Sequence, residues 1–296
     1  MPRKSGPISK RPIPHVKHVI AVASGKGGVG KSTVAANLAV ALARQSFDGQ
    51  NPRVGLLDLD IFGPSVPKLM GLEGLPPPEL TKAGAIIPFS NHGLQCMSIG
   101  FMVPQTDDTA VVWRGLMVQK AAQQLLFDVD WRGHGGEGHP GLDVLVVDMP
   151  PGTGDVQLTL GQLVKVDGAV IVSTPQDVAL IDAKKGVAMF RKVDIPIIGL
   201  LLNMAHFTCS TCSTPHHVFG PLTSFHQTAD GLNLKILGEL PITPSVSTDG
   251  DSGSPTALRS GASGTVHGVD EVQSVMDHVA KNVLAKLLAQ DKGAQS

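Results

Sequence analysis

The stretch from Ser24 to Thr33, SGKGGVGKST, decides the fold of this 296-residue chain. Four of its residues satisfy the pattern G-x-x-x-x-G-K-[ST] of a phosphate-binding loop, and they are Gly25, Gly30, Lys31 and Ser32. The apolar run HVIAVAS precedes the loop and a helix-forming run follows it, which is the context that the motif requires. Backbone N–H groups of such a loop face phosphates, and the helix N-terminus adds the positive end of its dipole. We therefore expect a nucleotide site, with ATP as the nucleotide.

Two side chains of the loop have specific roles in this chemistry. Lys31 should reach the β- and γ-phosphates, and the hydroxyl of Ser32 should bind Mg²⁺. The loop residues that we predict to contact the nucleotide are Gly25, Lys26, Gly27, Gly28, Val29, Gly30, Lys31, Ser32 and Thr33.

Four more apolar runs outside the loop read as buried strands: RVGLLDLD, DVLVVDMP, GAVIVSTP and IIGLLLN. They lack polar alternation, which is typical of strands buried on both faces of a parallel sheet. Helical stretches are expected over Lys31–Arg44, about Leu116–Phe127 and Asp177–Lys192, and a last helix over about Asp270–Gln290. Because strands alternate with helices, we predict an α/β fold with a doubly wound, mainly parallel sheet.

The predicted domain organisation is simple. Residues 16–290 form one nucleotide-binding domain, residues 1–15 a flexible basic arm and residues 291–296 a tail. Arg3, Lys4, Lys10 and Arg11 give the arm the charge of a mitochondrial import signal, but its prolines would interrupt the amphipathic helix of such a signal. The glycine-rich segment Arg132–Gly141 is expected to be a surface insertion.

Acidic residues end two of the predicted strands. Asp58 and Asp60 close the run GLLDLD, and Asp148 closes VLVVD. Ligands collect at the carboxyl ends of strands in open parallel sheets, so these acids should converge on the phosphate loop. We predict that Asp148 holds Mg²⁺, directly or through water, and that Asp58 lies beside the metal. A helix cap or a turn is the alternative role for either acid.

Composition limits the classes of partner. With 24 Lys and Arg against 25 Asp and Glu, the chain has no global charge that favours nucleic acid or an anionic membrane. We expect no nucleic-acid partner and at most peripheral membrane association. Three cysteines are too few for a disulfide framework, which favours a reducing compartment.

Cys209 and Cys212 form a C-x-x-C pair, which suits a metal because both thiolates can point into one coordination sphere. The pair supplies only half of a four-coordinate site, and Cys96 lies in an apolar run where it reads as a core residue. Two chains would supply four thiolates around a shared site. Within one chain, His206, His216 or His217 would be needed for zinc, although the usual spacer between ligand pairs is missing. A redox pair and two uncoordinated cysteines are further alternatives.

Lys26 adds a second lysine inside the phosphate loop. In this respect GKGGVGKS resembles the deviant Walker A motif of the ParA, MinD and nitrogenase iron protein class. In that class the extra lysine reaches across a dimer to the nucleotide of the partner, so the resemblance implies a homodimer. A lysine that is solvated in the loop is the alternative.

Longer segments resemble the Mrp/NUBPL family of iron–sulfur carrier ATPases, from about His15 to Leu288. The matching segments are VKHVIAVASGKGGVGKST, GLLDLDIFGPSVPKLMGL, VVWRGLMVQKA, VLVVDMPPGTGDVQL, GAVIVSTPQDVALIDAKKGVAMFRKV and LLNMAHFTCSTC. The likeness is closest to the mitochondrial member, which assists assembly of respiratory complex I.

This resemblance implies a function and further site residues. Cys209 and Cys212 would ligate a [4Fe–4S] cluster that bridges two subunits, Asp60 would position the attacking water, and Asn203 would contact adenine. The catalytic residues would then be Lys26, Lys31, Asp60 and Asp148. The chain would be an ATPase of the mitochondrial matrix, or of the cytoplasm if it is bacterial, that delivers clusters to apo-proteins, complex I subunits among them.

One alternative belongs to a different class, a positioning or partition ATPase of the ParA/MinD type without a metal cluster. It predicts a basic DNA-binding face or an amphipathic membrane helix at the C-terminus. The last predicted helix carries Asp270, Glu271 and Asp277 beside its lysines, so neither feature is indicated.

Overall fold

The structure is a computed structural model that describes residues 10–102, 115–209, 211–212, 214–259 and 268–295. Residues 1–9 of the predicted arm, residue 296 of the predicted tail and the first four residues of VVWRGLMVQKA lie outside the described residues.

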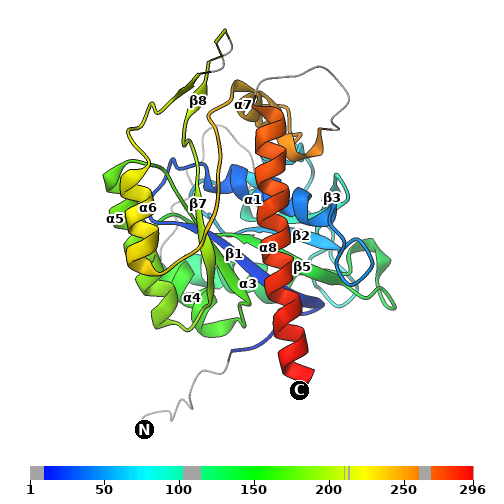
Figure 1. Ribbon diagram of the computed structural model, residues 1–296. Coiled ribbons are helices and arrows are strands. Elements are labelled where there is room, and N and C mark those ends of the chain that lie inside the picture. The colour runs from blue at the N-terminus through cyan, green and yellow to red at the C-terminus, as the bar shows by residue number, and fades with distance from the viewer. Residues whose placement is uncertain (1–9, 103–114, 210, 213, 260–267, 296) are drawn as a thin grey trace.

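A twisted sheet forms the centre of the molecule (Figure 1). Its order is β10-β7-β6-β1-β5-β2-β4-β3, and every neighbouring pair is parallel except β3 with β4. The strands are β1 (Val16–Ser24), β2 (Val54–Asp58), β3 (Phe89–Asn91), β4 (Leu94–Ser98), β5 (Leu142–Asp148), β6 (Gly168–Ser173), β7 (Ile197–Leu202) and β10 (Ile236–Glu239). The predicted doubly wound, mainly parallel sheet is confirmed, because the uninterrupted apolar runs are the strands that both layers bury.

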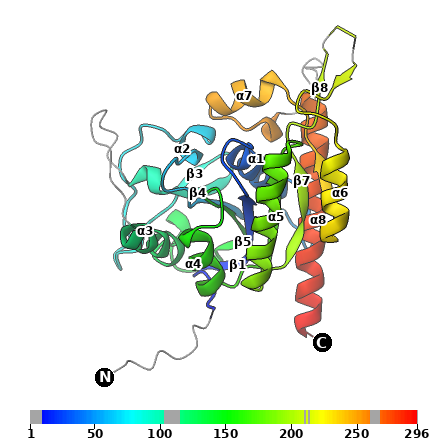
Figure 2. The ribbon, with the colours of Figure 1, turned by 90° about the vertical axis from the view of Figure 1, so that its left-hand side faces the viewer.

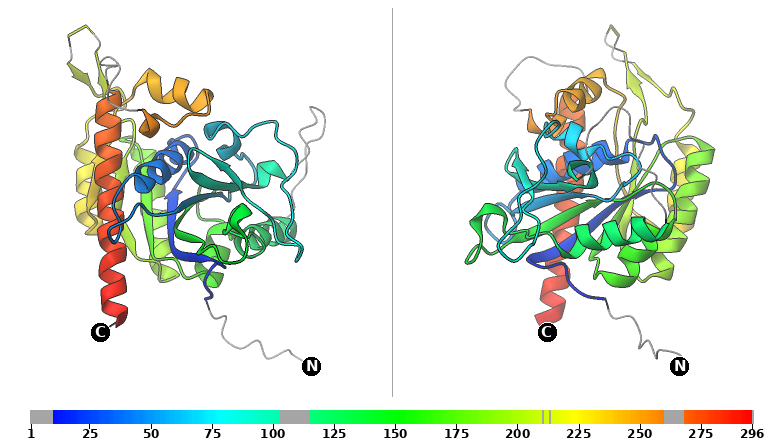
Figure 3. Two further views of the ribbon diagram at one scale, coloured as in Figure 1. Left: turned by 90° about the vertical axis from the view of Figure 1, so that its right-hand side faces the viewer. Right: turned by 180° about the vertical axis from the view of Figure 1, so that it is seen from behind.

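Helices cover both faces of the sheet. On one face, α1 (Lys31–Ala43) packs against α8 (Val269–Gln295), which lies in front of the sheet in Figure 1. On the other face lie α3 (Gly115–Phe127), α4 (Asp155–Leu163), α5 (Asp177–Lys192) and α6 (Thr223–Leu232), several of which come forward in the rear view of Figure 3. The predicted helix over Asp177–Lys192 has the observed bounds, and the predicted helices after Lys31 and before Phe127 differ by one residue.

Short elements gather at the carboxyl ends of the strands. There α2 (Val66–Leu69) contacts α7 (Pro244–Asp251), and a two-stranded hairpin of β8 (Phe207–Thr208) and β9 (Pro215–His216) projects beyond them (Figure 2). In the part of the chain that the structure describes, short 3₁₀ turns lie at Ile99–Phe101, Gly133–Gly135 and Thr256–Leu258. No helix of the described residues has both the length and the apolar character needed to cross a membrane.

The amino-terminal arm is not flexible in its described part, which corrects the prediction for residues 10–15. Arg11 forms a parallel bridge with Val164 after α4, and its guanidinium lies 3.5 Å from the centre of the Phe127 ring. Ile13 is only 1% exposed and belongs to the core. The prolines that forbid a helix here suit an extended segment, which packs beside the end of α4 instead.

The carboxyl-terminal boundary is also corrected. α8 continues to Gln295, so residues 291–295 are helix and not a tail. Asp291 accepts a 2.8 Å hydrogen bond from Lys17 and lies 3.3 Å from Nε2 of His18, so both ends of the domain meet at β1. As predicted, the glycine-rich insertion lies between a helix and a strand, α3 and β5, although Arg132 anchors it with a bidentate ion pair to Asp130.

Candidate functional site

The phosphate loop connects the end of β1 to the first residue of α1. Gly28 and Gly30 have φ values of 78° and 79°, a left-handed region that favours glycine. Gly25 is required for another reason: a Cβ there would lie 2.5 Å from the backbone nitrogen of Ala183 in α5 and would overlap the Asp182 carbonyl group. Glycine at this position therefore lets the backbone of α5 lie directly against the loop.

A cavity of about 460 Å³ opens above the loop, a volume in the range of small-molecule sites. It is lined by Ser24, Lys26, Gly27, Gly28, Gly30, Lys31, Ser32, Thr33, Asp60, Pro64, Ser65, Lys68, Leu69 and Pro151. Residues predicted from two distant motifs, the loop and the strand end at Asp60, thus line one cavity.

Lys31 pairs with Asp148 across the floor of the site. Its Nζ donates to Oδ1 of Asp148 at 2.5 Å and to Oγ of Ser32 at 3.1 Å. The second carboxylate oxygen of Asp148, Oδ2, is buried and has no hydrogen-bond partner among the described residues. Burial raises the pKa of Asp148, and the ammonium of Lys31 opposes this shift. A hydroxyl and an unpartnered carboxylate oxygen beside the loop are ligands that fit Mg²⁺.

Asp58 is fully buried, and its carboxylate organises the loop that follows β2. Oδ1 accepts the N–H of Asp60 at 2.9 Å, and Oδ2 accepts the N–H groups of Ser65 and Val66 at 3.1 and 3.2 Å. The hydroxyl of Ser98 donates to Oδ2 at 3.0 Å. Burial and then the negative charge of Asp148 raise the pKa of Asp58 to about 7. Through these hydrogen bonds the side chain of Asp58 holds the segment Asp60–Ser65 in place.

Asp60 lies in the cavity wall, half-exposed, at the start of that segment. Burial raises its pKa, while Lys31 and the backbone N–H groups of Gly63 and Phe62 oppose the rise. The carboxylate of Asp60 thus borders the cavity in which we expect the phosphates of the nucleotide.

A second loop lies against the first. Gly152, within the segment Pro150–Asp155, donates its N–H to the carbonyl of Ser24 at 3.1 Å. Gln157, which is 1% exposed, holds this segment through its Nε2, which lies 2.7 Å from the carbonyl of Pro150 and 3.1 Å from that of Gly152. The role of Gln157 was not predicted, because a glutamine in a first helical turn gives no signal of which carbonyls it meets.

Lys26 points toward the start of α5. Its Nζ lies 3.4 Å from Oε1 of Gln176, and it lines the cavity. Val178 and Ile181, on the same stretch of α5, expose 59% and 52% of their surface. The second lysine of the loop therefore sits beside an exposed apolar face.

Asn203 connects the loop to the end of β7. Its Nδ2 donates to the carbonyl of Val29 at 2.8 Å, and its Oδ1 accepts the N–H of Met204 at 3.0 Å. It also lines a neighbouring cavity of about 340 Å³ together with Gly30, Thr33 and residues of α7. That cavity adjoins the phosphate site through Gly30 and Thr33, which line both.

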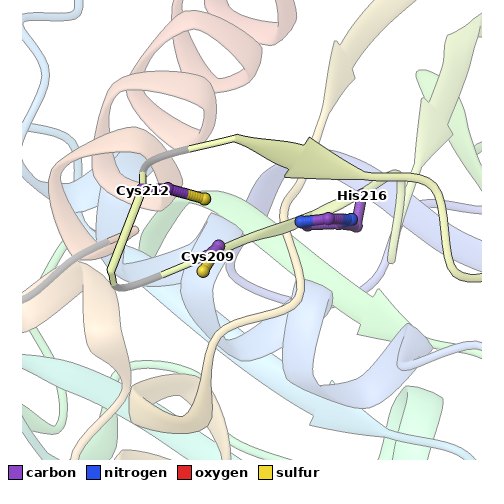
Figure 4. Close-up of side chains that lie close together, drawn as sticks. All are labelled: Cys209, Cys212 and His216. Atoms are coloured by element: carbon purple, nitrogen blue, oxygen red, sulfur yellow. The ribbon is translucent and has the colours of Figure 1, made fainter.

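The cysteine pair lies at the tip of the β8–β9 hairpin (Figure 4). Cys209 is partly exposed and Cys212 is exposed, whereas Cys96 is fully buried in β4, as predicted. Backbone N–H groups of Cys212 and then Thr211 lower the pKa of Cys209. The sulfur atoms and one ring nitrogen of His216 all lie within 4.8 Å of one another, which makes the hairpin a candidate metal centre.

Sequence and structure comparisons place these features in a known family. The family model ParA, described as NUBPL iron-transfer P-loop NTPase, matches residues 15–282. The mouse protein named iron-sulfur cluster transfer protein NUBPL is 47% identical over 278 residues, which are 94% of this chain and 80% of that protein. An Arabidopsis thaliana protein named iron-sulfur protein required for NADH dehydrogenase, mitochondrial, is 47% identical over 83% of this chain and 73% of its own length.

Solved structures extend the comparison. A nucleotide-binding protein from Archaeoglobus fulgidus, in complex with ADP and with cobalt found in it, superposes with a TM-score of 0.64 at 34% identity, over 81% of this chain and 87% of its own. MinD from Pyrococcus horikoshii superposes with a TM-score of 0.60 at 18% identity, over 90% of this chain and 96% of its own, which shows a shared fold only.

The sheet order and the phosphate loop define the molecule as a P-loop NTPase with the fold of MinD and ParA proteins. Within that class, the chain belongs to the NUBPL iron-transfer P-loop NTPase family. The predicted resemblance is thereby confirmed, and the ParA/MinD reading is reduced to a distant relation of fold.

Proposed function

We propose that the chain is an ATP-dependent carrier that takes up an iron–sulfur cluster on Cys209 and Cys212 and passes it to apo-proteins. One observation carries this proposal: a phosphate site and a pair of accessible thiols occur in a single chain of an iron-transfer family. The thiols belong to the β8–β9 hairpin, which projects from the rest of the molecule in Figure 1, and an acceptor protein can reach them there. Two chains supply the four thiolates that a [4Fe–4S] cluster takes.

The nucleotide half of the cycle uses the residues around the cavity. Entry of ATP draws Lys31 from Asp148 to the phosphates, because the phosphates offer it more negative charge. Ser32 and Asp148 would hold Mg²⁺, which would neutralise charge on the phosphates. Asp60 orients the water that attacks the γ-phosphate, and Asn203 contacts adenine. Lys26 reaches the nucleotide of the partner subunit, which makes the dimer sensitive to ATP.

A short covalent path connects the two halves. Asn203, which bonds to Val29 of the phosphate loop, precedes the hairpin by only a few residues. The backbone carbonyl oxygen of His206 accepts the N–H of Ile242 at 2.6 Å, so the segment is held along the chain between β10 and α7. A change in the loop can therefore move the base of the hairpin, and cluster release follows dimer opening.

The names of the relatives support a narrower role. The mouse and Arabidopsis proteins are named for cluster transfer and for a requirement of mitochondrial NADH dehydrogenase. We propose complex I subunits as clients, and the mitochondrial matrix as the compartment.

Anaerobic reconstitution tests the carrier function. Wild type should hold about four irons and four sulfides per dimer. The variant Cys209→Ala should lose them, and Cys96→Ala, at a buried thiol, should keep them. Zinc alone without sulfide in the reconstituted dimer, or a loaded cluster that never reaches an apo-acceptor, would overturn the proposal.

A further inference from the structure

The hairpin brings a third metal-binding side chain to the cysteines. In its register Phe207 lies opposite His216, and Thr208 opposite Pro215. Side chains alternate between the two faces of a strand and opposite residues share a face, so Cys209, two residues after Phe207, is on the face of His216. The N–H of Cys209 donates to the carbonyl of Thr214 at 3.1 Å, which closes the tip. Figure 4 shows the three side chains together at this hairpin.

The spacing of the three ligand atoms suits one ion. Sγ of Cys209, Sγ of Cys212 and a ring nitrogen of His216 lie within 4.8 Å of one another. Around a tetrahedral zinc ion, with Zn–S near 2.3 Å and Zn–N near 2.0 Å, ligand atoms lie roughly 3.5 to 3.8 Å apart. Side-chain rotation at these exposed positions supplies the remaining approach of about 1 Å.

The neighbouring histidines are engaged elsewhere. Nε2 of His206 lies 3.2 Å from Oε1 of Glu271, and Nδ1 of His217 lies 3.1 Å from the carbonyl oxygen of Ala205. Within the described part of the chain, the ring of His216 has no hydrogen-bond or ion-pair partner. Among these three histidines, the fold therefore offers His216 to the thiols.

We propose that Cys209, Cys212 and His216 form, within one protomer, a three-ligand site for a single zinc-like divalent cation. Two thiolates and an imidazole are the ligands that zinc prefers, and the fourth position stays open to water or to a ligand from another protein. This site goes beyond the proposed carrier function: the same thiolates cannot hold the ion and a bridging cluster at once. A protomer with the ion bound is thus a state apart from the cluster-loaded dimer.

Anaerobic titration of the full-length apoprotein with Co²⁺, a spectroscopic probe for zinc, tests the site. We expect one Co²⁺ per chain, with the visible absorption of a tetrahedral ion and a thiolate charge-transfer band, and displacement by Zn²⁺. His216→Ala should weaken binding at least as much as the roughly 10–100-fold that loss of an outer partner costs. His217→Ala, at the adjacent residue, should leave the affinity unchanged.

Two outcomes would overturn the proposal. One Co²⁺ per two chains, with four thiolates in the charge-transfer intensity, would mean an ion shared between protomers. Equal affinities of wild type and His216→Ala would mean that the cysteines bind alone. Iron and sulfide per dimer, measured in parallel for His216→Ala and wild type, separate this test from that of the carrier. Normal cluster loading of His216→Ala together with lost Co²⁺ affinity supports both proposals. Absent cluster loading in wild type overturns only the carrier proposal.

Discussion

At the scale of single residues, the phosphate site contains two carboxylates that are buried away from solvent. Asp58 and Asp148 are fully buried, and Lys31 forms an ion pair with Asp148. Both carboxyls have raised pKa values because burial disfavours their charged forms. A proton or a bound cation lowers the free-energy cost of this buried negative charge. Acid and nucleotide with Mg²⁺ should therefore both stabilise the site.

This argument gives a pH dependence. The pKa of Asp58 rises from 3.8 in the unfolded chain to about 7 in the folded one, so its contribution to stability is present below pH 4 and is lost as pH rises through 7. Mg²⁺ that binds together with ADP would offset the carboxylate charge that the proton no longer neutralises. We predict that the increase in melting temperature on adding Mg²⁺–ADP is larger at pH 8 than at pH 5.5. ADP with a chelator is the control, and an equal increase at both pH values would contradict the prediction.

The cysteine pair gives a second prediction at this scale. Backbone N–H groups of Cys212 and Thr211 stabilise the thiolate of Cys209, which lowers its pKa. In the variant Cys212→Ser, which keeps these N–H groups, alkylation of Cys209 by iodoacetamide should show a midpoint below the ordinary thiol value of about 8.5. Cys96 serves as the internal reference, since burial raises its pKa to about 12 and it should not react. A midpoint at or above the ordinary value would refute the assignment.

Single residues also show the limits of sequence interpretation. The pattern around Lys31 predicted a nucleotide cavity because glycine spacing and strand context are local properties. The partners of Asp58 were not predictable, since they combine N–H groups of the loop after β2 and of α2 with the hydroxyl of Ser98, which only the pairing of β2 with β4 brings near. His216 was one of three open candidates until the hairpin register distinguished it.

At the scale of elements, the phosphate loop and α5 pack so closely at Gly25 that a Cβ would not fit between them. Gly25→Ala should therefore displace α5 or the loop, with a loss of about 1–3 kcal/mol in the free energy of unfolding and a larger loss of ADP affinity. Gly27→Ala is the matched control for stability, because a Cβ there has no protein atom within 4 Å and its φ is not positive. Urea unfolding compares the stability of the two variants, and calorimetric titration with ADP compares Gly25→Ala with wild type. Equal free energies of unfolding of Gly25→Ala and Gly27→Ala would show that the loop and α5 separate without cost.

Elements differed in how well the sequence predicted them. α5 was predicted to the residue, because its apolar periodicity is long and its first turn begins with an acid. The two-residue strands β8 and β9 were not predicted, since strands this short depend on tertiary contacts such as the bridge of Phe207 with Ile242. The segment 10–15 was misjudged for a similar reason: its prolines exclude a helix but say nothing about docking beside Val164.

At the scale of the whole molecule, the exposed apolar face of α5 bears on the proposed dimer. Ile181 and Val178 lie beside Lys26, where the partner subunit would have to approach. We predict that Ile181→Lys weakens ATP-dependent dimerisation at least tenfold, with a change in stability within about 0.5 kcal/mol, as is usual at exposed positions. Light scattering with ATP and Mg²⁺ measures the dimer.

Leu80→Lys is the control for this variant. Leu80 is 62% exposed, and the next residue, Thr81, lines a cavity with Pro14 and His15 at the opposite end of β1. The Leu80→Lys variant should dimerise like wild type. If Leu80→Lys impaired the dimer and Ile181→Lys did not, the partner subunit would bind elsewhere on the surface.

The central position of β1 has a consequence for synthesis of the chain. β1 is the first strand to be made, yet its two neighbours, β5 and β6, begin only at Leu142 and Gly168. At about 5–20 residues per second, the ribosome needs on the order of ten seconds to reach the first of them. During that interval β1 has no native neighbour on either side, and α1 lacks the cover of α8, which follows all of the strands in the sequence. We therefore expect the nucleotide site to form only after β5, β6 and α8 have emerged, and the nascent chain to be prone to aggregation until then.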